Sequence, residues 1–282
     1  MRVCCLASGS KGNCTYIESS KTKILLDCGL SLKQLKEKLN SINVNISEIS
    51  YIVITHEHSD HIKGLDQLLK NYNIKVYINS SLYGYFEIKE SKYLPKFVVY
   101  NNDFNIEDVT IKPICLSHDS ICCNGYTFIS NSRKICYLTD LGCFNQSIID
   151  AVKESSLAII ESNHDEKMLL SNPNYSLLLK RRILSNKGHL SNFASASLIK
   201  ELVLSGTKQV ILAHLSEENN TPSLAFNTVK NYLEKYGILE SVNYKIDVAF
   251  QDKIGNIYNL KWLLPLFLLP FFSYIYIFND FV

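Results

Sequence analysis

The sequence predicts one α/β domain in which two β-sheets pack face to face and helices cover their outer surfaces. Short apolar runs rich in β-branched residues dominate the beginning of the chain, and strand and helix patterns then alternate through both halves. No repeat, low-complexity linker or Pro/Gly-rich boundary divides the sequence. We therefore expect a single domain over residues 1–260, followed by a hydrophobic extension of unknown role over residues 261–282.

Strands are expected where apolar and β-branched residues lie between turn residues. These runs cover residues 2–7, 14–18, 23–27, 51–55, 75–78, 97–100, 109–116, 126–129, 134–139, 157–161, 209–213 and 244–250. A last run at residues 257–260 is expected to close a hairpin with 244–250 across residues 252–256.

Helices are expected between these strands. The first follows Ser31, a suitable N-cap, and carries Leu32, Leu35, Leu39 and Ile42 on one face because their spacing follows the helical period. The other predicted helices cover residues 62–71, 146–154, 175–184, 193–204 and 223–236. Helices are therefore available to cover both sheets.

The composition is that of a globular protein. Hydrophobic residues make up 46% and charged residues 20% of the chain, which excludes a disordered class. The formal net charge of +2 provides no whole-molecule field for nucleic acid, so such binding would need a local patch. The nine cysteines include no CxxC pair, and the opening residues match a strand rather than a secretory leader. We therefore expect a reduced, cytoplasmic protein without a cysteine-based zinc site.

The end of the chain is unusually apolar. Residues 262–278 contain no charged side chain, and a membrane-spanning helix needs about 20 apolar residues. Pro265 and Pro270 weaken a helix there without excluding it. Two expectations remain open: a tail that associates with a membrane, and a packed or poorly ordered extension.

A cluster of metal-ligand residues follows the strand at residues 51–55. His56, His58, Asp60 and His61 fall within six residues. Imidazole and carboxylate groups are the ligands of catalytic zinc, manganese and iron sites. In an extended turn, His56 and His58 can face one metal ion, while Asp60 and His61 at the start of a helix reach a second. With three of the seven histidines here, a polar loop without function explains the pattern poorly.

Four further candidate residues each stand at the end of an apolar strand. They are Asp27, His118, Asp140 and His214. Functional groups collect at the carboxyl ends of strands in layered α/β folds. One such residue alone could be a loop residue or a helix cap, but four in equivalent positions indicate a common site. Cys28 follows Asp27 directly and is the one cysteine expected to lie near a metal.

The order of these residues resembles the pattern of the metallo-β-lactamase superfamily over most of the chain. The resemblance implies a four-layer αββα sandwich and two divalent metal ions, Zn²⁺ or Mn²⁺, with iron as a further choice. It implies that one metal is held by His56, His58 and His118, and the other by Asp60, His61 and His214. Asp140 would bridge the two metals, and Asp27 would orient a ligand.

A closer resemblance is to the YycJ/WalJ-like group of this superfamily. It is carried by residues 8–13 (Ser-Gly-Ser-Lys-Gly-Asn), 161–165 (Glu-Ser-Asn-His-Asp), 188–192 (Gly-His-Leu-Ser-Asn) and 214–220, which begin His-Leu-Ser. The group is regarded as exonuclease-like and as acting on DNA, so the resemblance implies a DNA exonuclease. Residues after about 260 fall outside the resemblance, and it identifies no protein partner.

The expected chemistry is hydrolysis by a water molecule whose pKa two cations lower. Asp60 can orient that water or accept its proton. His189 is the candidate proton donor to a leaving oxygen, with a simple helix-capping role as the alternative. Its segment is similar to the Gly-His-Ser-Thr segment of the phosphodiesterases called RNase Z, in which a glutamate partners the histidine, and Glu161 matches that glutamate by position. His164 is expected either in the wall of the active site or on the surface.

Two segments are candidate substrate contacts. Ser8, Ser10 and Asn13 lie in a glycine-containing loop where a phosphate could rest, although tight-turn chemistry alone also explains that loop. The basic residues 180–182, with Lys187 downstream, could contact a nucleic-acid backbone, although a solvated helix face explains them equally well.

Three classes of function remain open at this point. A nuclease or phosphodiesterase is favoured by residues 188–192 and the closer resemblance. A small-molecule hydrolase acting on a thioester or lactone would use the same metals. A di-iron redox protein, a binding module or an inactive DNA-binding scaffold is disfavoured, because flavodiiron proteins usually carry Glu at the place of His58 and every expected ligand is present. For a hydrolase, activity should fall below about pH 6.5, since the histidine ligands must be deprotonated.

Overall fold

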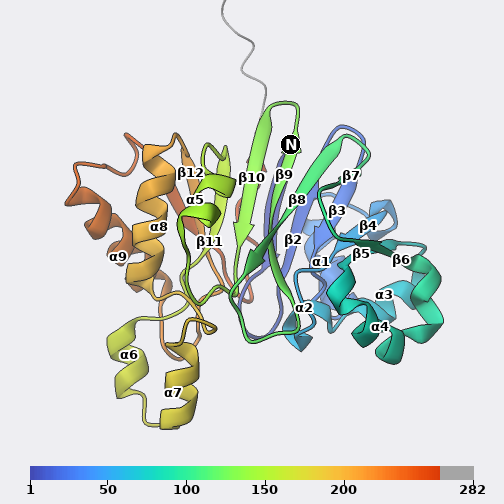
Figure 1. The fold of residues 1–282 in the computed structure, drawn as a ribbon. Coiled ribbons are helices and arrows are strands. Elements are labelled where there is room, and N and C mark those ends of the chain that lie inside the picture. The colour runs from blue at the N-terminus through green and yellow to red at the C-terminus, as the bar shows by residue number, and fades with distance from the viewer. Residues whose placement is uncertain (261–282) are drawn as a thin grey trace, which may run out of the picture.

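The computed structural model describes residues 1–260, which form four layers: helices, two facing seven-stranded sheets, and helices again (Figure 1). This is the αββα sandwich that the sequence predicts. Because both faces of each sheet are covered, strands of this fold are expected to be apolar on both faces.

The first sheet has the strand order β14-β1-β2-β3-β4-β5-β6. Strands β1, β2, β3 and β14 pair antiparallel, whereas β3 to β6 run parallel. The bounds are β1 (Arg2–Ala7), β2 (Cys14–Glu18), β3 (Lys23–Leu26), β4 (Tyr51–Val53), β5 (Lys75–Asn79), β6 (Phe97–Tyr100) and β14 (Tyr258–Asn259).

The second sheet has the order β13-β12-β11-β10-β9-β8-β7. Strands β7 to β10 pair antiparallel, and β10 to β13 run parallel. The bounds are β7 (Phe104–Ile106), β8 (Val109–Leu116), β9 (Cys123–Ser130), β10 (Arg133–Leu138), β11 (Leu157–Glu161), β12 (Gln209–Ala213) and β13 (Lys245–Val248).

The helices divide between the outer faces of the two sheets (Figure 1). Those on the side of the first sheet are α1 (Leu32–Ser41), α2 (Ser59–Ile62), α3 (Leu65–Asn71) and α4 (Tyr83–Lys89). Those on the side of the second sheet are α5 (Gln146–Val152), α8 (Asn192–Leu204) and α9 (Pro222–Glu234). The pair α6 (Glu166–Ser171) and α7 (Leu177–Ile183) projects from the body below α8 and α9 in Figure 1.

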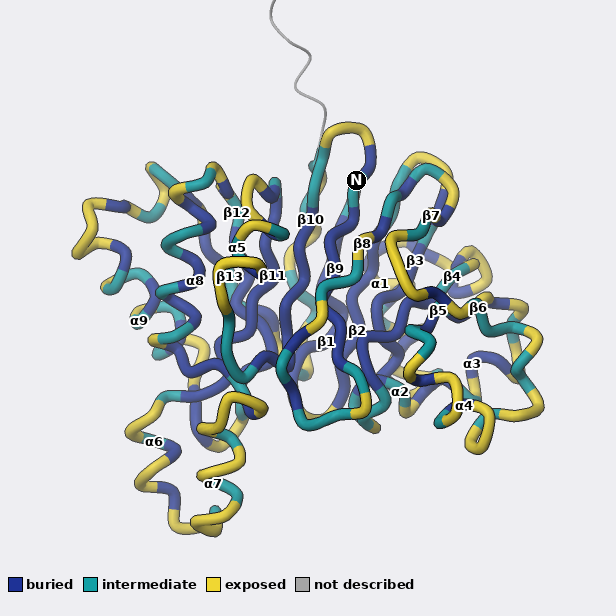
Figure 2. Tube along the Cα trace, in the orientation of Figure 1, coloured by how far each residue is buried: buried dark blue, intermediate teal, exposed yellow. Residues whose placement is uncertain are grey.

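Three apolar cores correspond to the three boundaries between layers. Along β1, Val3 and Cys5 pack between the sheets, whereas Cys4 and Leu6 pack toward the helices of the first sheet. This alternation follows from the two-residue period of a strand. Figure 2 shows the resulting pattern, with buried strands at the centre and exposed segments on the outer helices.

Several local predictions were wrong. The expected hairpin between residues 244–250 and 257–260 does not form, because β13 pairs with β12 in the second sheet and β14 pairs with β1 in the first. The helix predicted over residues 62–71 is two helices, α2 and α3, with Gly64 as the N-cap of the second. Strand β7 and helices α4 and α6 were not predicted, because each is short and lacks a strong apolar period.

All nine cysteines are free, and six of them are buried. Within residues 1–260, no helix has both the length and the apolar character needed to cross a membrane. The apolar segment at residues 262–278, for which membrane contact was one expectation, lies outside the described residues.

Candidate metal centre

The cluster of His56, His58, Asp60 and His61 follows shortly after the end of β4. Ile54 and Thr55 continue the buried chain to His56, His58 is the N-cap of α2, and Asp60 lies in the first turn of that helix. His56 and His61 are fully buried, whereas His58 and Asp60 are partly exposed. The expected change from an extended turn to a helix therefore occurs within the motif.

Three residues from other strands reach the same place through an unusual backbone. Asp27, Asp140 and His214 stand just after β3, β10 and β12 with φ angles of 61°, 61° and 56°. A left-handed conformation costs a non-glycine residue roughly 1–3 kcal/mol and is concentrated at functional sites. The sharp turn directs one side chain from each strand end toward the same edge of the sandwich.

The side chains of His56, His58 and His118 form one cluster. Their ring centroids lie 4.6, 5.2 and 5.1 Å apart. One nitrogen of each ring lies within 4.8 Å of the others. Three imidazoles in this arrangement are suited to a divalent transition metal.

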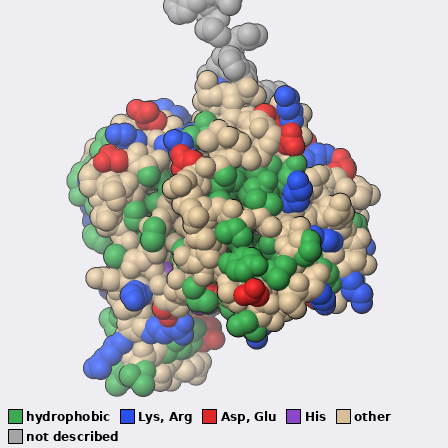
Figure 3. Space-filling view, turned by 45° about the vertical axis from the view of Figure 1, so that its right-hand side comes forward, with side chains coloured by type: hydrophobic (Ala, Val, Ile, Leu, Met, Phe, Trp, Pro, Cys, Tyr) green, Lys and Arg blue, Asp and Glu red, His purple; other side chains and the backbone are tan. Residues whose placement is uncertain are grey.

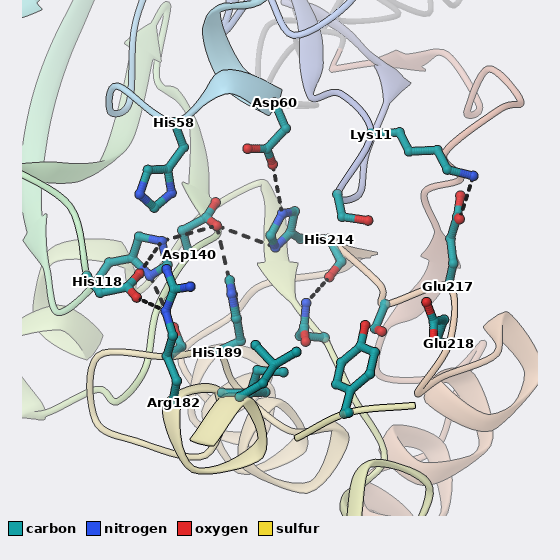
Figure 4. Close-up of a pocket in the computed structure, with 18 residues that line it drawn as sticks. Lys11, His58, Asp60, His118, Asp140, Arg182, His189, His214, Glu217 and Glu218 are labelled. Atoms are coloured by element: carbon teal, nitrogen blue, oxygen red, sulfur yellow. Dashed lines mark hydrogen bonds and ion pairs between the residues drawn. The ribbon is translucent and has the colours of Figure 1, made fainter. Parts of the chain in front are cut away.

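A second cluster consists of Asp60, His61 and His214. Oδ2 of Asp60 lies 3.4 Å from Nε2 of His61 and 3.7 Å from Nε2 of His214. Asp140 stands between the clusters, with Oδ2 3.3 Å from Nε2 of His61 and Oδ1 3.7 Å from Nε2 of His118. One carboxylate thus faces both groups of ligands, as a bridging residue would (Figure 4).

Buried polar atoms without a partner indicate that the ligand residues suit divalent cations. Nε2 of His56, His118 and His214, and Oδ2 of Asp140, are buried and have no hydrogen-bond partner within residues 1–260. Such atoms are costly to bury unless something pairs with them. Three of the four belong to the two clusters and the fourth to Asp140 between them. Imidazole nitrogens with carboxylate oxygens are the donor set of zinc, manganese or iron.

His61 is held from behind by a carboxylate of the first sheet. Its Nδ1 donates a hydrogen bond of 2.7 Å to Asp27, which directs Nε2 toward the other members of the second cluster. Thr55 fixes Asp27 in turn: its backbone N–H donates to Oδ1 at 2.8 Å, and its hydroxyl lies 2.9 Å from Oδ2. The Thr55 hydroxyl also lies 3.0 Å from Nδ1 of His56, so this residue contacts a member of the first cluster and the support of the second. Sequence reasoning missed Thr55, although its position directly before His56 was a usable signal.

The second sheet supplies a different support, Glu161. Its Oε1 accepts hydrogen bonds from Nδ1 of His214 at 2.8 Å and from Nδ1 of His189 at 2.9 Å. Its Oε2 accepts from the backbone N–H groups of Leu141 and Leu190, each at 3.0 Å. Glu161 therefore holds both a candidate ligand and the candidate proton donor, whereas the sequence indicated only the second contact.

The charges around these histidines favour positive charge at the centre. Burial opposes protonation of His61, but the carboxylates of Asp27 and Asp140 raise its pKa to about 10. Burial likewise opposes ionisation of Glu161, but His189 and His214 lower its pKa to about 2. Carboxylates that stabilise a proton here also stabilise a metal cation at the same place.

The centre opens into a cavity of about 400 Å³, drawn in Figure 4. His189 lines it, and Arg182 and Lys11 lie on opposite sides of the ligand residues. Arg182 pairs with Asp119, and Lys11 pairs with Glu217 at 2.6 Å. From the sequence, Arg182 was expected only as part of the basic cluster at residues 180–182. This cluster lies on α7, in the projection formed by α6 and α7, where Figure 3 shows basic and apolar side chains together.

The remaining predicted residues take different places. Ser10 lines the cavity, and Asn13 donates from Nδ2 to Oδ2 of Asp60 at 3.1 Å. Ser8 accepts the backbone N–H of His214 at 2.8 Å, so it fixes that strand end. His164 is buried outside the cavity lining, and burial lowers its pKa to about 4. Cys28 belongs to none of the ligand clusters within residues 1–260.

Fold and centre together define a metallo-β-lactamase-fold hydrolase. The sequence model of the metallo-beta-lactamase superfamily matches residues 7–113. The chain is 36% identical to the exodeoxyribonuclease WalJ of Streptococcus pneumoniae over 86% of its own length and 91% of the relative. It is 37% identical to the exodeoxyribonuclease YycJ of Bacillus anthracis over 82% of its length and 89% of the relative. The protein thus belongs to the metallo-β-lactamase superfamily and, within it, to the group that includes WalJ and YycJ, which confirms both resemblances.

A solved structure supports the fold independently. The metallo-beta-lactamase fold protein YhfI from Bacillus subtilis superposes with a TM-score of 0.69, covering 91% of this chain and 98% of that one at 15% identity. At this identity the likeness concerns the fold alone.

Proposed function

We propose that this protein is an exonuclease that hydrolyses DNA phosphodiester bonds with two divalent metal ions, zinc or manganese. The observation that carries the proposal is the hydrogen bond from His189 to Glu161, which holds an imidazole at the cavity beside the ligand clusters. The two exodeoxyribonuclease relatives, at 36% and 37% identity over most of the chain, support DNA as the substrate. Nine free cysteines are consistent with a cytoplasmic location.

The ligand assignment follows the two clusters. His56, His58 and His118 would hold one ion, and Asp60, His61 and His214 the other, with Asp140 between them. Two such ions, when bound, polarise a phosphoryl oxygen and lower the pKa of a water molecule. Asp27 and Glu161 keep the ring orientation of His61 and His214, because each accepts the hydrogen bond of Nδ1.

The protein's own groups would handle the protons. Oδ1 or Oδ2 of Asp60 accepts the proton of the attacking water, since this carboxylate lines the cavity and is partly exposed. His189 donates a proton from Nε2 to the leaving sugar oxygen, because Glu161 occupies its Nδ1. A sugar alkoxide is a poor leaving group, so this donation accelerates the reaction by about 10²–10⁴-fold in typical general acid catalysis.

The runner-up function is hydrolysis of a small thioester or lactone. A cavity of about 400 Å³ suits a small ligand as well as a nucleotide. A thiolate leaves without a proton, so thioester hydrolysis would give His189 nothing to do. A lactone releases an alkoxide that needs a proton, as a sugar alkoxide does, so the paired His189 and Glu161 argue against the thioester alone. The exodeoxyribonuclease relatives favour the phosphodiester over the lactone.

Cleavage of 5′-phosphorylated single- and double-stranded DNA, with Mn²⁺ and Zn²⁺ supplied separately, tests the proposal. We expect stepwise shortening by the wild type, none by Asp60→Ala and much less by His189→Ala. A protein that holds two metal ions per chain and cleaves thioesters or lactones but not DNA would establish the runner-up instead.

A further inference from the structure

A second cavity, of about 460 Å³, adjoins the candidate metal centre. It shares Ser10, Lys11 and Asp60 with the first cavity, so the loop between β1 and β2 forms a common wall. Nothing in the proposed chemistry uses this second space. Its lining is mostly polar, with Gln34 and Ser59 offering further hydrogen-bond donors.

Three lysines line this second cavity: Lys11, Lys38 from α1 and Lys63 from the end of α2. The acidic groups that face it are Asp60 and Asp252. Asp60 is a candidate metal ligand, so bound cations would offset its charge. Lys11 is already paired with Glu217. Lys38 and Lys63 therefore supply the positive charge of the cavity when the centre is loaded.

Lys38 is held in place without being neutralised by a hydrogen-bonded carboxylate. Its ammonium group donates 2.9 Å to the backbone oxygen of Asp252, which leaves two further N–H donors. Burial lowers the pKa of Lys38. An anion bound in the cavity would offset the free-energy cost of burying this ammonium group.

The wall between the cavities is preformed. Gln251 accepts the backbone N–H of Lys11 at 2.7 Å and donates to the backbone oxygen of Gly12 at 3.0 Å. Gly12 itself packs so closely that an added Cβ would lie 2.5 Å from the backbone oxygen of Gly29. A rigid loop keeps Lys11 between the two spaces.

We propose that the second cavity binds backbone phosphates of the DNA strand beyond the scissile bond. The strand runs from the catalytic cavity over Ser10 and Lys11 to Lys38 and Lys63, and Arg182 lies at its other end. This inference rests on the proposed function. A cationic groove that continues from a catalytic site is the usual means of holding a single strand without reading its sequence.

Binding tests the inference without requiring cleavage. The ligand is a fluorescent 12-nucleotide DNA with phosphorothioate linkages. The readout is the fluorescence anisotropy of this DNA as the full-length protein, loaded with its metals, is added. Lys38→Gln combined with Lys63→Gln should raise Kd by about tenfold and reduce the slope of log Kd against log salt by about 1.4, or 0.7 per lost contact. The control, Lys33→Gln combined with Lys70→Gln, removes the same charge from α1 and α3 outside the cavity and should change Kd less than twofold.

Cleavage kinetics separate the two proposals. The Lys38/Lys63 variant should raise KM for the 12-nucleotide DNA with natural linkages by about tenfold, yet change KM for thymidine 5′-(p-nitrophenyl phosphate) much less, because that ester is too short to reach the cavity. Equal Kd and salt slope for the variant, the control and the wild type would overturn the inference while leaving DNA cleavage standing. Lysine-dependent binding by a wild type that cleaves neither substrate would overturn the proposed function and leave the DNA-binding cavity standing.

Discussion

Asp27 in the first sheet and Glu161 in the second are both fully buried carboxylates at strand ends, yet they support different numbers of histidines. Asp27 accepts the hydrogen bond of one imidazole, that of His61. Glu161 accepts the hydrogen bonds of two, those of His189 and His214, through the same oxygen. The first sheet thus supports a candidate metal ligand alone, whereas the second connects a candidate metal ligand to a group that lines the cavity.

This difference separates two tasks within one centre. On the side of the first sheet, His61 is completely buried, so its proposed role is restricted to holding a metal ion. On the side of the second sheet, the ring of His189 is 21% exposed and can reach a substrate. Substitutions on the two sides should therefore affect metal content and proton transfer differently.

The largest effect is expected for Asp60, which belongs to both tasks. Asp60→Ala removes a candidate ligand and the proposed proton acceptor, so DNA cleavage should fall by at least about 10⁴-fold. Cleavage assays with metal analysis of the same protein check this. Activity within tenfold of the wild type would contradict the assignment of Asp60.

Glu161→Gln should have the next largest effect, because it disturbs two histidines at once. We expect about a 10³-fold loss of kcat together with weaker metal binding. The measurement is kcat at saturating metal alongside metal affinity by competition with a chromogenic chelator. A change in only one of the two quantities would show that Glu161 supports one histidine, not both.

His189→Ala should reduce DNA cleavage by about 10²-fold while the protein keeps its metals. This outcome separates a proton donor from a ligand. Metal content per chain, measured by atomic absorption, provides the distinction. Loss of one metal ion would mean that His189 is itself a ligand.

Asp27→Asn should have the smallest effect of the four. Asparagine tolerates the left-handed backbone at this position and can still accept a hydrogen bond from His61, but it lacks the charge. Metal affinity or activity should fall by about tenfold, at the low end for such supporting residues. A comparison with Asp27→Ala, which removes the acceptor and should cost more, is the matched control; equal effects would assign the loss to charge alone.

The layers and the cluster of His56, His58, Asp60 and His61 could be predicted because both depend on local patterns, whereas the assignment of His118 and His214 to the two ligand clusters came from the superfamily resemblance. Apolar runs end in single polar residues, and the structure gathers Asp27, Asp140 and His214 from three such ends. The shared contact of Glu161 was not predictable, since it depends on β11 and β12 being neighbours. In that pairing Glu161 lies opposite Ala213, directly before His214. The position of residues 258–259 was mispredicted for the same reason: β14 pairs with β1, at the other end of the chain.

The most direct test of the central claim compares two leaving groups. The claim is that Glu161 couples the metal centre to a proton donor, His189, for a poor leaving group. The kcat/KM of wild type and His189→Ala should be measured on DNA and on thymidine 5′-(p-nitrophenyl phosphate), whose nitrophenolate leaves without a proton. The account predicts a loss of about 10²-fold on DNA and less than about threefold on the activated ester. Equal losses on both substrates would contradict it.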